Sequence, residues 1–171
     1  MQSFKISIFS LIFVLVILIS AIHYRVGIKN SIILDIVSGS STSSIATSLY
    51  ENKIILNPTI FKIYVRLSSN DHKFKAGEYK FKSTQSIHSI VDKLTKGDFF
   101  YRKLTLLPGS TISNILELGN SEGLINDLVT DPEKLLKKKG ITLQEGIFFP
   151  DTFFYLKGEN FSSILIKSYE K

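Results

Sequence analysis

An uncharged run of seventeen residues, 6–22, constrains this chain of 171 residues more than any other feature. At about 1.5 Å rise per residue the run makes roughly 25 Å of helix, which just spans a hydrocarbon core. Phe4 and Tyr24 stand where aromatic side chains meet a membrane interface. The run therefore predicts a transmembrane helix over 6–22, preceded by residues 1–5 and followed by a linker over 23–31.

Two other interpretations of this run stay open. A cleaved signal peptide has an apolar region of about 7 to 15 residues that ends in a small-x-small site. Ser20 and Ala21 give only a weak version of that site. A buried core helix is the other alternative. Lys5 precedes the run while Arg25 and Lys29 follow it, so the positive-inside rule does not orient the helix.

The charge of the chain is basic but dispersed. The formal net charge is +6 and the pI is near 9.4. Aromatic residues interleave with the lysines only at 74–82 and 99–103, so a solvated basic surface is favoured over a nucleic-acid site. A basic protein that contacts nucleic acid or anionic lipid remains a hypothesis resting on charge alone. The absence of cysteine excludes disulfides and thiolate metal sites, and His23, His72 and His88 lack ligand spacing, so we expect no metal and no cofactor.

The chain beyond the run alternates short apolar strands with polar turns and amphipathic helices, which predicts an α+β fold. Ser83 and Thr84 are expected to cap a helix that ends at Gly97. Strands are expected at residues 32–37, 54–56, 78–82 and 101–107. Other helices are expected around Ile45 and Leu49, after Asn57 and Pro58, around Ile112 and Ile115, at 124–129, after Pro132 and from Phe161 to Tyr169.

One turn pattern occurs twice. Residues 39–45 and 109–115 share glycine, serine and isoleucine at the same spacing, seventy residues apart, and each segment follows an apolar strand. This is a weak internal repeat, and convergent turn chemistry explains it about as well.

Residues 143–153, Leu-Gln-Glu-Gly-Ile-Phe-Phe-Pro-Asp-Thr-Phe, depart from the general pattern. Two carboxylates, Glu145 and Asp151, flank a stiff apolar stretch with a glycine and a proline. Aromatic rings beside carboxylates suit a carbohydrate groove, because sugar rings present apolar faces and hydroxyl groups. A proline-aspartate corner also fixes a loop for structural reasons, with Asp151 accepting backbone N–H bonds. Composition alone favours the structural interpretation.

The same segment resembles the E-G-aromatic-x-F-P-D-T-Y signature of the MltG, or YceG-like, family of endolytic murein transglycosylases. Phe153 replaces the usual tyrosine, and Ile147 replaces an aromatic residue. Other similar motifs follow in order, with Asn-Pro at 57–58, Lys-Ala-Gly-Glu-Tyr at 75–79, Leu-Thr-Lys-Gly at 94–97 and Leu-Pro-Gly-Ser-Thr at 107–111, the last without the family's glutamate. The candidate site residues are those that match the signature: Glu145, Gly146, Phe149, Pro150, Asp151 and Thr152.

The resemblance implies a domain arrangement and a location. A transmembrane helix would be followed by a small LysM-like β-α-α-β module over 32–72 and by the first part of a YceG-like transglycosylase domain over 73–171. Murein lies outside the cell membrane, so we expect a single-pass inner-membrane protein with a cytoplasmic N-terminus and a periplasmic main domain.

The resemblance also implies a reaction. An acid protonates the glycosidic oxygen of a nascent glycan strand while the muramic 6-hydroxyl attacks C1, which leaves a 1,6-anhydro end. The family's catalytic glutamate belongs to a later E-K-E motif, and nothing after Asp151 resembles it. We therefore expect that glutamate beyond Lys171 and a chain truncated before it. Glu145 is expected to orient the cleft, by binding substrate or by bracing the loop, and Asp151 to cap the turn.

The expected partners are peptidoglycan glycan strands, the membrane and cell-wall synthesis proteins, with no nucleic acid. The alternative function is a non-enzymatic, membrane-tethered protein that binds peptidoglycan or acts as a scaffold, which the missing E-K-E segment favours for this polypeptide.

Overall fold

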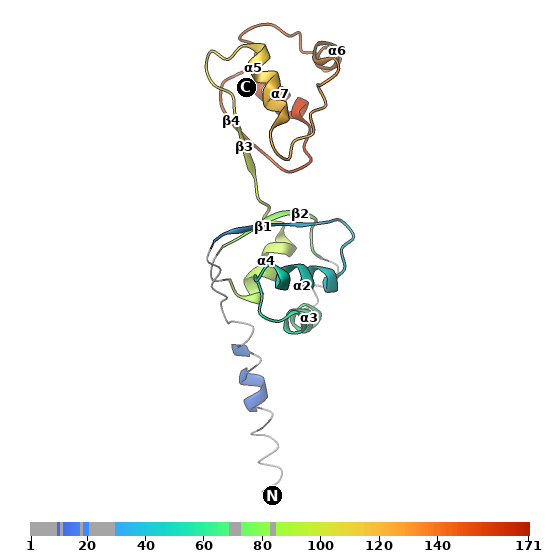
Figure 1. Ribbon diagram of the computed structural model, residues 1–171, viewed down its shortest axis with the longest axis vertical. Helices are drawn as coiled ribbons and strands as arrows, with labels where there is room; N and C mark the ends of the chain where they lie inside the picture. Colours follow the sequence, from blue (N-terminus) through green and yellow to red (C-terminus); the bar gives the residue numbers. More distant parts are fainter. Residues whose placement is uncertain (1–9, 11, 18, 21–29, 69–72, 83–84) are drawn as a thin grey trace, which may run out of the picture. The chain divides into compact units, whose positions relative to one another are not determined.

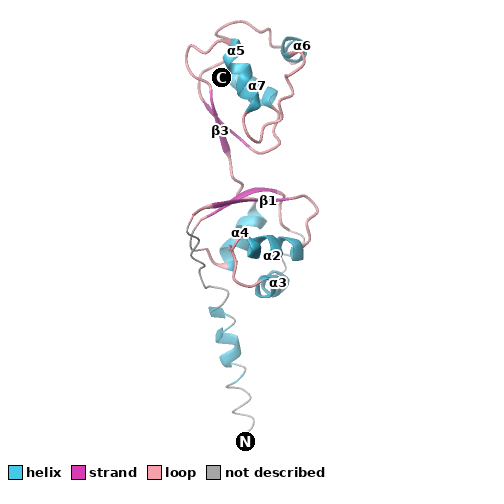
Figure 2. Cartoon of the chain, in the orientation of Figure 1, coloured by secondary structure: helices cyan, strands magenta, loops and turns pink. Residues whose placement is uncertain are grey.

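The computed structural model describes residues 10, 12–17, 19–20, 30–68, 73–82 and 85–171. The chain divides into two compact units, Met1–Phe99 and Phe100–Lys171 (Figure 1). Each unit combines an antiparallel pair of strands with helices (Figure 2). The α+β part of the predicted fold is therefore correct.

The first unit builds its core between one strand pair and its helices. Leu34 on the first strand lies opposite Tyr79 on the second, and Tyr79 and Phe81 are fully buried. In chain order the elements are β1 (Ile32–Ile36), α2 (Thr42–Glu51), α3 (Pro58–Leu67), β2 (Gly77–Phe81) and α4 (Ile87–Lys96).

Local capping signals position these helices. The Asn57 side chain accepts the N–H groups of Thr59 and Ile60 ahead of α3. Gly97 ends α4 in the left-handed conformation at φ 75°, as predicted. Ser86 caps α4, whereas the predicted caps at 83–84 lie outside the described residues.

The predicted strand at 54–56 is wrong. These residues form the turn between α2 and α3. Ile54 and Ile55 are buried, and both donate their backbone N–H to the carbonyl of Leu49. The apolar pattern correctly indicated that Ile54 and Ile55 are buried. Their backbone N–H groups bond to α2, however, and not to a neighbouring strand.

The second unit repeats the strand pairing with different helices. Leu104 lies opposite Phe153, and the Leu106 N–H donates to the carbonyl of Asp151 just beyond the pair (2.9 Å). Its elements are β3 (Arg102–Thr105), α5 (Ile112–Glu117), the 3-10 turn η1 (Leu118–Asn120), α6 (Pro132–Lys138), β4 (Thr152–Tyr155) and α7 (Phe161–Tyr169).

The predicted helix at 124–129 is also wrong. The Ile125 N–H donates to the carbonyl of Glu159 (3.0 Å), and the Ile125 carbonyl accepts from Phe161 (2.9 Å). Asn126 accepts the N–H of Leu128 with its side chain. Bonds to the start of α7 and a local asparagine turn thus replace the helical ladder.

The repeated turn is one part of a repeated order of elements. Gly39 and Gly109 adopt φ 80° and 78°, and the residue two positions after each caps a helix. Both units then continue through a helix that begins with proline, a strand that pairs antiparallel with the first, and a last helix. The similarity therefore extends beyond turn chemistry.

The division between the units lies after Phe99. The predicted boundary at 72/73 falls inside the first unit, because β2 pairs with β1 and α4 contributes to the same core. The assignments of 32–72 as LysM-like and of 73–171 as part of a transglycosylase domain stay predictions.

The structure contradicts the predicted transmembrane helix over 6–22. Across the described residues, no helix combines the length and apolar character needed to cross a membrane. Helical backbone in this range is described only at 10, 12–17 and 19–20, and the remaining positions lie outside the described residues. The prediction rested on an uncharged run of seventeen residues, which is at the lower limit of the roughly 17–25 residues that a membrane-spanning helix needs. The predicted single-pass inner-membrane placement with a cytoplasmic N-terminus rested on this helix and is corrected with it.

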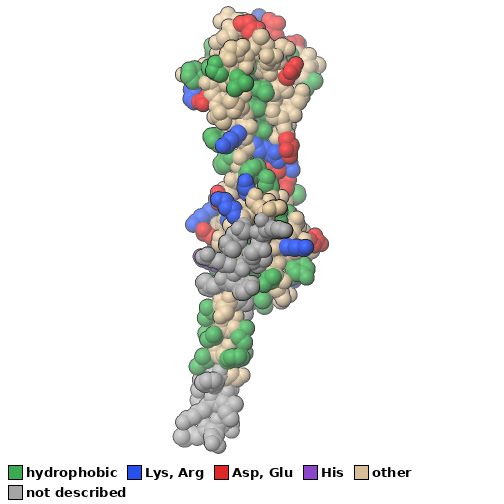
Figure 3. Space-filling view, turned by 60° about the vertical axis from the view of Figure 1, so that its left-hand side comes forward, with side chains coloured by type: hydrophobic (Ala, Val, Ile, Leu, Met, Phe, Trp, Pro, Cys, Tyr) green, Lys and Arg blue, Asp and Glu red, His purple; other side chains and the backbone are tan. Residues whose placement is uncertain are grey.

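The basic residues do not gather into one uninterrupted surface on the face shown in Figure 3, where acidic side chains lie among them. Lys93 pairs with Asp98 at 2.6 Å, and Lys96 pairs with Asp92 at 2.8 Å. Such neighbouring carboxylates weaken the local positive potential that a polyanion would need.

Candidate functional site

A strand-turn-helix segment of the second unit forms one side of the candidate site. After β3, Gly109 adopts φ 78°, and the Ser110 N–H donates to the carbonyl of Leu107 (3.2 Å). Thr111 then caps α5 by accepting the N–H of Asn114 (3.3 Å). The turn therefore fixes where α5 begins.

The signature segment forms the facing side and is held by α7. The Phe149 N–H donates to the carbonyl of Ser168 (3.2 Å), and the Ser168 hydroxyl donates to the carbonyl of Phe149 (2.9 Å). Ser168 is fully buried. Gly146 makes the turn at φ 77°, a backbone conformation that a residue with Cβ rarely adopts.

Glu145 joins the two sides. Its Oε1 and Oε2 accept the N–H of Ile112, at 3.3 and 3.1 Å. Ile112 is the first residue of α5, where backbone N–H groups have no partner within the helix. The carboxylate therefore ties the signature segment to the start of α5, across 33 residues of sequence.

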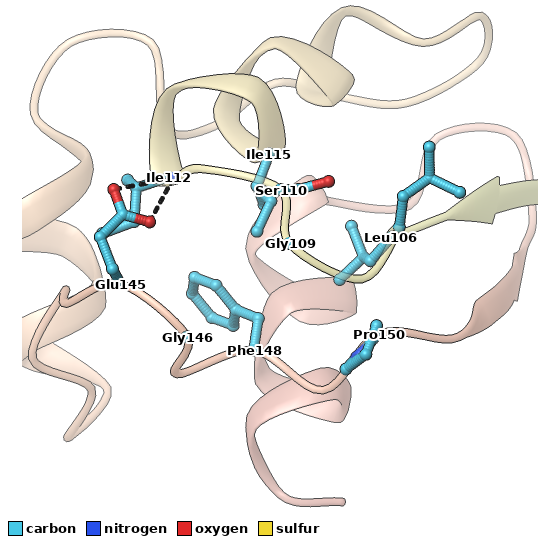
Figure 4. A pocket seen from close by; sticks show the side chains of 10 residues that line it. Leu106, Gly109, Ser110, Ile112, Ile115, Glu145, Gly146, Phe148 and Pro150 are labelled. Carbon is cyan, nitrogen blue, oxygen red and sulfur yellow. Dashed lines mark hydrogen bonds between the residues drawn. The ribbon is translucent and has the colours of Figure 1, made fainter.

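A hollow of about 290 Å³ lies between the two sides. Figure 4 shows the Phe148 ring pointing toward α5, between Glu145 and Pro150. The lining residues are Leu106, Leu107, Gly109, Ser110, Ile112, Ile115, Glu145, Gly146, Phe148 and Pro150. The surface is thus mostly apolar, with one hydroxyl, one carboxylate and exposed backbone.

Asp151 lies beside the hollow and does not line it. Lys171 pairs with its Oδ2, and the Thr152 N–H donates to its Oδ1 at 2.7 Å. These two hydrogen bonds, the one from Lys171 foremost, hold the pKa of the Asp151 carboxyl below its usual range. The Thr152 hydroxyl contacts the hydroxyl of Thr105 across the strand pair at 3.0 Å.

The predicted site residues thus separate into two groups. Glu145, Gly146 and Pro150 line the hollow. Phe149 is half exposed but lies outside the lining, where Lys171 stacks over its ring. Asp151 and Thr152 hold the strand end that supports the segment.

A family model described as the YceG-like family matches residues 34–171. The chain belongs to the YceG-like family. The resemblance in the sequence motifs is thereby confirmed. The similarity of this YceG-like chain to one named enzyme is more limited. An endolytic murein transglycosylase from Bacillus subtilis (strain 168) is 32% identical over 88 residues, which are 51% of this chain and 24% of that protein.

A YceG-like protein from Listeria monocytogenes, known from a crystal structure, is 25% identical to this YceG-like chain. The match covers 84% of this chain and 54% of that protein, with a TM-score of 0.41. In both comparisons the match spans less than two thirds of the relative's length.

Sequence reasoning left Leu107, Ser110 and Phe148 of this YceG-like chain out of the site, although all three line the hollow. Leu107 and Ser110 belong to the turn that was assigned a structural role, and Phe148 occupies a variable position of the signature. The signal that could have found them was present. The turn and the signature are both family motifs, and motifs that lie far apart in sequence often meet at one site.

Proposed function

We propose that this chain supplies a glycan-binding groove of a murein transglycosylase, and that the hollow beside α5 holds a stretch of the glycan strand. The observation that carries the proposal is the place of the signature segment. Four of its residues line a hollow whose other side includes a second family motif, the turn at 107–110; the four are Glu145, Gly146, Phe148 and Pro150.

The lining has the chemistry that a sugar requires. Leu107, Phe148 and Pro150 offer apolar surface to the C–H faces of a sugar ring, while Ser110 offers a hydroxyl. Gly109 lets a ligand come close to the backbone, because an added Cβ there would have no other atom within 4 Å. Few polar groups placed in a mostly apolar hollow are typical of a small-ligand or glycan site.

Glu145 acts in this proposal as a positioning residue. Both oxygens face the Ile112 N–H, so the carboxylate sets the distance between the signature segment and α5. Of the two roles expected for it, the contacts favour bracing of the loop over direct binding of substrate.

We propose further that the whole protein cleaves glycan strands to 1,6-anhydromuramic ends. The glycosidic oxygen takes a proton as the C1–oxygen bond breaks, and the muramic 6-hydroxyl forms the new bond to C1 and loses its proton. A general acid works best with a raised pKa. Asp151 has a lowered pKa, which disfavours it as this acid, and the family resemblance assigns the acid to a glutamate of the later E-K-E motif.

A second candidate function is glycan binding without cleavage, in a binding or scaffold protein. The contacts of the two signature carboxylates favour this function, because neither is free to act as an acid: Glu145 accepts a backbone N–H and Asp151 pairs with Lys171. In either function the expected partners are peptidoglycan glycan strands, with cell-wall synthesis proteins as predicted further partners.

Binding is tested by sedimentation of the full chain with purified peptidoglycan. Leu107→Asp places a charge in the hollow at a side chain that is 64% exposed, and Leu56→Asp is its matched control in the first unit at 61% exposed. We expect the first variant to lose most of its binding while the control sediments like the unaltered chain. Equal sedimentation of both variants would reject the hollow as the glycan site.

Cleavage is tested separately by incubating the chain with purified glycan strands and analysing the products by mass spectrometry. A transglycosylase yields products with 1,6-anhydro ends, whereas a binding protein yields none. Anhydro products that disappear in Glu145→Gln would show that Glu145 is catalytic and would contradict the positioning role.

A further inference from the structure

A second hollow, of about 310 Å³, adjoins α5. Ile112 and Ile115 of α5 line the first hollow, whereas Ser113 and Leu116 line the second. Ser113 directly follows Ile112, and Leu116 directly follows Ile115. Consecutive residues are separated by about 100° around a helix of 3.6 residues per turn. The two hollows therefore lie on neighbouring faces of the same short helix.

One side of the second hollow is formed by the connection between η1 and α6, which is longer than the corresponding connection between α2 and α3 in the first unit. In the first unit, residues 52–57 lead from α2 to α3. In the second unit, residues 121–131 lead from η1 to α6. The longer connection supplies Asn126, Leu128 and Val129 to the hollow. The longer connection thus forms part of this hollow.

The polar groups of this wall are held in place. Asn126 donates from Nδ2 to Oδ1 of Asn120 (3.0 Å), and its own Oδ1 accepts the Leu128 N–H (3.3 Å). Gly119 packs beside this amide so closely that an added Cβ would lie 2.8 Å from Asn126 Cγ. The bond from Asn126 engages the Asn120 oxygen, and the exposed Asn120 side chain, which lines the hollow, also carries an Nδ2 donor group. A preorganised amide costs little entropy when a ligand binds.

Apart from Ser113, the remaining lining is apolar or acidic. Leu116, Pro132 and Val129, which is 73% exposed, provide apolar surface, and Glu117 provides a carboxylate. The described residues that line this hollow include no lysine or arginine. This composition suits an uncharged ligand with a methyl group and an amide better than a phosphate.

We propose that the second hollow binds an N-acetylhexosamine unit of the same glycan strand that occupies the first, so that the strand crosses α5. The acetamide methyl would lie against Leu116 and Val129, its carbonyl would accept from Asn120, and its N–H would donate to Glu117. A helix with its side chains is about 10–12 Å wide, so a strand of several sugars reaches both hollows. This inference rests on the proposed function.

The test compares two soluble fragments of peptidoglycan glycan, a disaccharide and a tetrasaccharide of alternating N-acetylglucosamine and N-acetylmuramic acid. Their affinities for the full chain are measured by titration calorimetry. We expect the tetrasaccharide to bind about tenfold more tightly than the disaccharide, because the second contact becomes intramolecular once the first has formed.

Two variants address the second hollow. Val129→Asp and Asn120→Ala should each bring the tetrasaccharide affinity down by about tenfold, toward that of the disaccharide. Ile125→Asp is the matched control, because Ile125 is 51% exposed in the same connection and does not line the hollow. It should keep the length dependence of the unaltered chain.

The outcomes separate this inference from the function on which it rests. If both fragments bind equally, or if Val129→Asp and Asn120→Ala keep the tenfold difference, the second hollow is not a sugar site although the first still is. If Leu107→Asp leaves all binding unchanged, the proposed function itself fails. Loss of the length dependence in both variants, with Ile125→Asp unaffected, supports the inference.

Discussion

Asp127 caps the last helix of the second unit from a distant part of the sequence, and its removal makes a quantitative test of the fold. Asn160, the residue before α7, makes no capping bond with its side chain. Instead the Asp127 carboxylate accepts the Ser162 N–H at 2.9 Å and the Ser162 hydroxyl at 2.5 Å. A negative charge at this end also favours the helix dipole.

The expected cost of Asp127→Ala follows from these two bonds. A hydrogen bond to a charged group contributes about 1.5–3 kcal/mol net when buried, and an exposed helix cap about 1 kcal/mol. Ser162 is only 8% exposed, so its donors lose a partner with little access to water. We expect the free energy of unfolding of the second unit to fall by about 2–4 kcal/mol.

The assay is urea unfolding of the full chain followed by circular dichroism, together with hydrogen exchange of the α7 amides. Asp92→Ala is the control, because Asp92 pairs with Lys96 on the exposed face of α4 and such pairs contribute about 0.3–0.5 kcal/mol. A double-mutant cycle with Ser162→Ala isolates the hydroxyl contact. If Asp127→Ala costs no more than Asp92→Ala and α7 exchanges at its usual rate, the remote cap does not stabilise the helix.

Three further predictions concern the brace, the packing and the pH response. Glu145→Ala should weaken sedimentation with peptidoglycan and speed hydrogen exchange at the start of α5. Glu145→Gln keeps one acceptor, so it should retain most of the sedimentation and most of the protection from exchange. Identical behaviour of the two variants would contradict the bracing role of Glu145. Gly119→Ala should lower the free energy of unfolding by about 1–3 kcal/mol, since the added Cβ would lie 2.7 Å from Phe161; a denaturation midpoint equal to that of the unaltered chain would refute this. Burial, with a smaller contribution from Asp98, raises the pKa of Tyr79 to about 12, so the folded state keeps a proton that the unfolded chain loses above about pH 10. Stability should therefore fall as the pH rises from about 10 to 12, and Tyr79→Phe should reduce this fall whereas Tyr101→Phe, at an exposed position, should not.

Local signals predicted the helix ends well. Asn57 followed by proline begins α3, and Gly97 ends α4, because caps and left-handed glycines act within a few residues. The apolar stripe of α7, from Phe161 to Leu165, likewise faces the core. Where the backbone bonded outside the expected element, the pattern misled. The Ile54 N–H donates to Leu49 at the end of α2, and the Ile125 N–H donates to Glu159 far along the chain, so neither apolar run forms the expected strand or helix.

The candidate site shows the same limit. The motifs identified the signature segment and the turn before α5, but assigned them separate roles. Only half of the predicted residues line the hollow, because Phe149 is bonded to α7 and Asp151 pairs with Lys171. Phe148 faces the hollow while Phe149, the next residue, does not.

The sequence by itself determined the family, through an ordered set of motifs over most of the chain, and it determined the α+β class through the spacing of apolar residues and caps. It also predicted a transmembrane helix over 6–22, whereas no helix among the described residues is long and apolar enough to cross a membrane. The tertiary structure alone decided that Glu145 meets Ile112 and that α5 adjoins two hollows. Periodicity shows which side of an element is buried. The partner it is buried against depends on contacts between residues far apart in the chain, and those contacts exist only once the chain has folded.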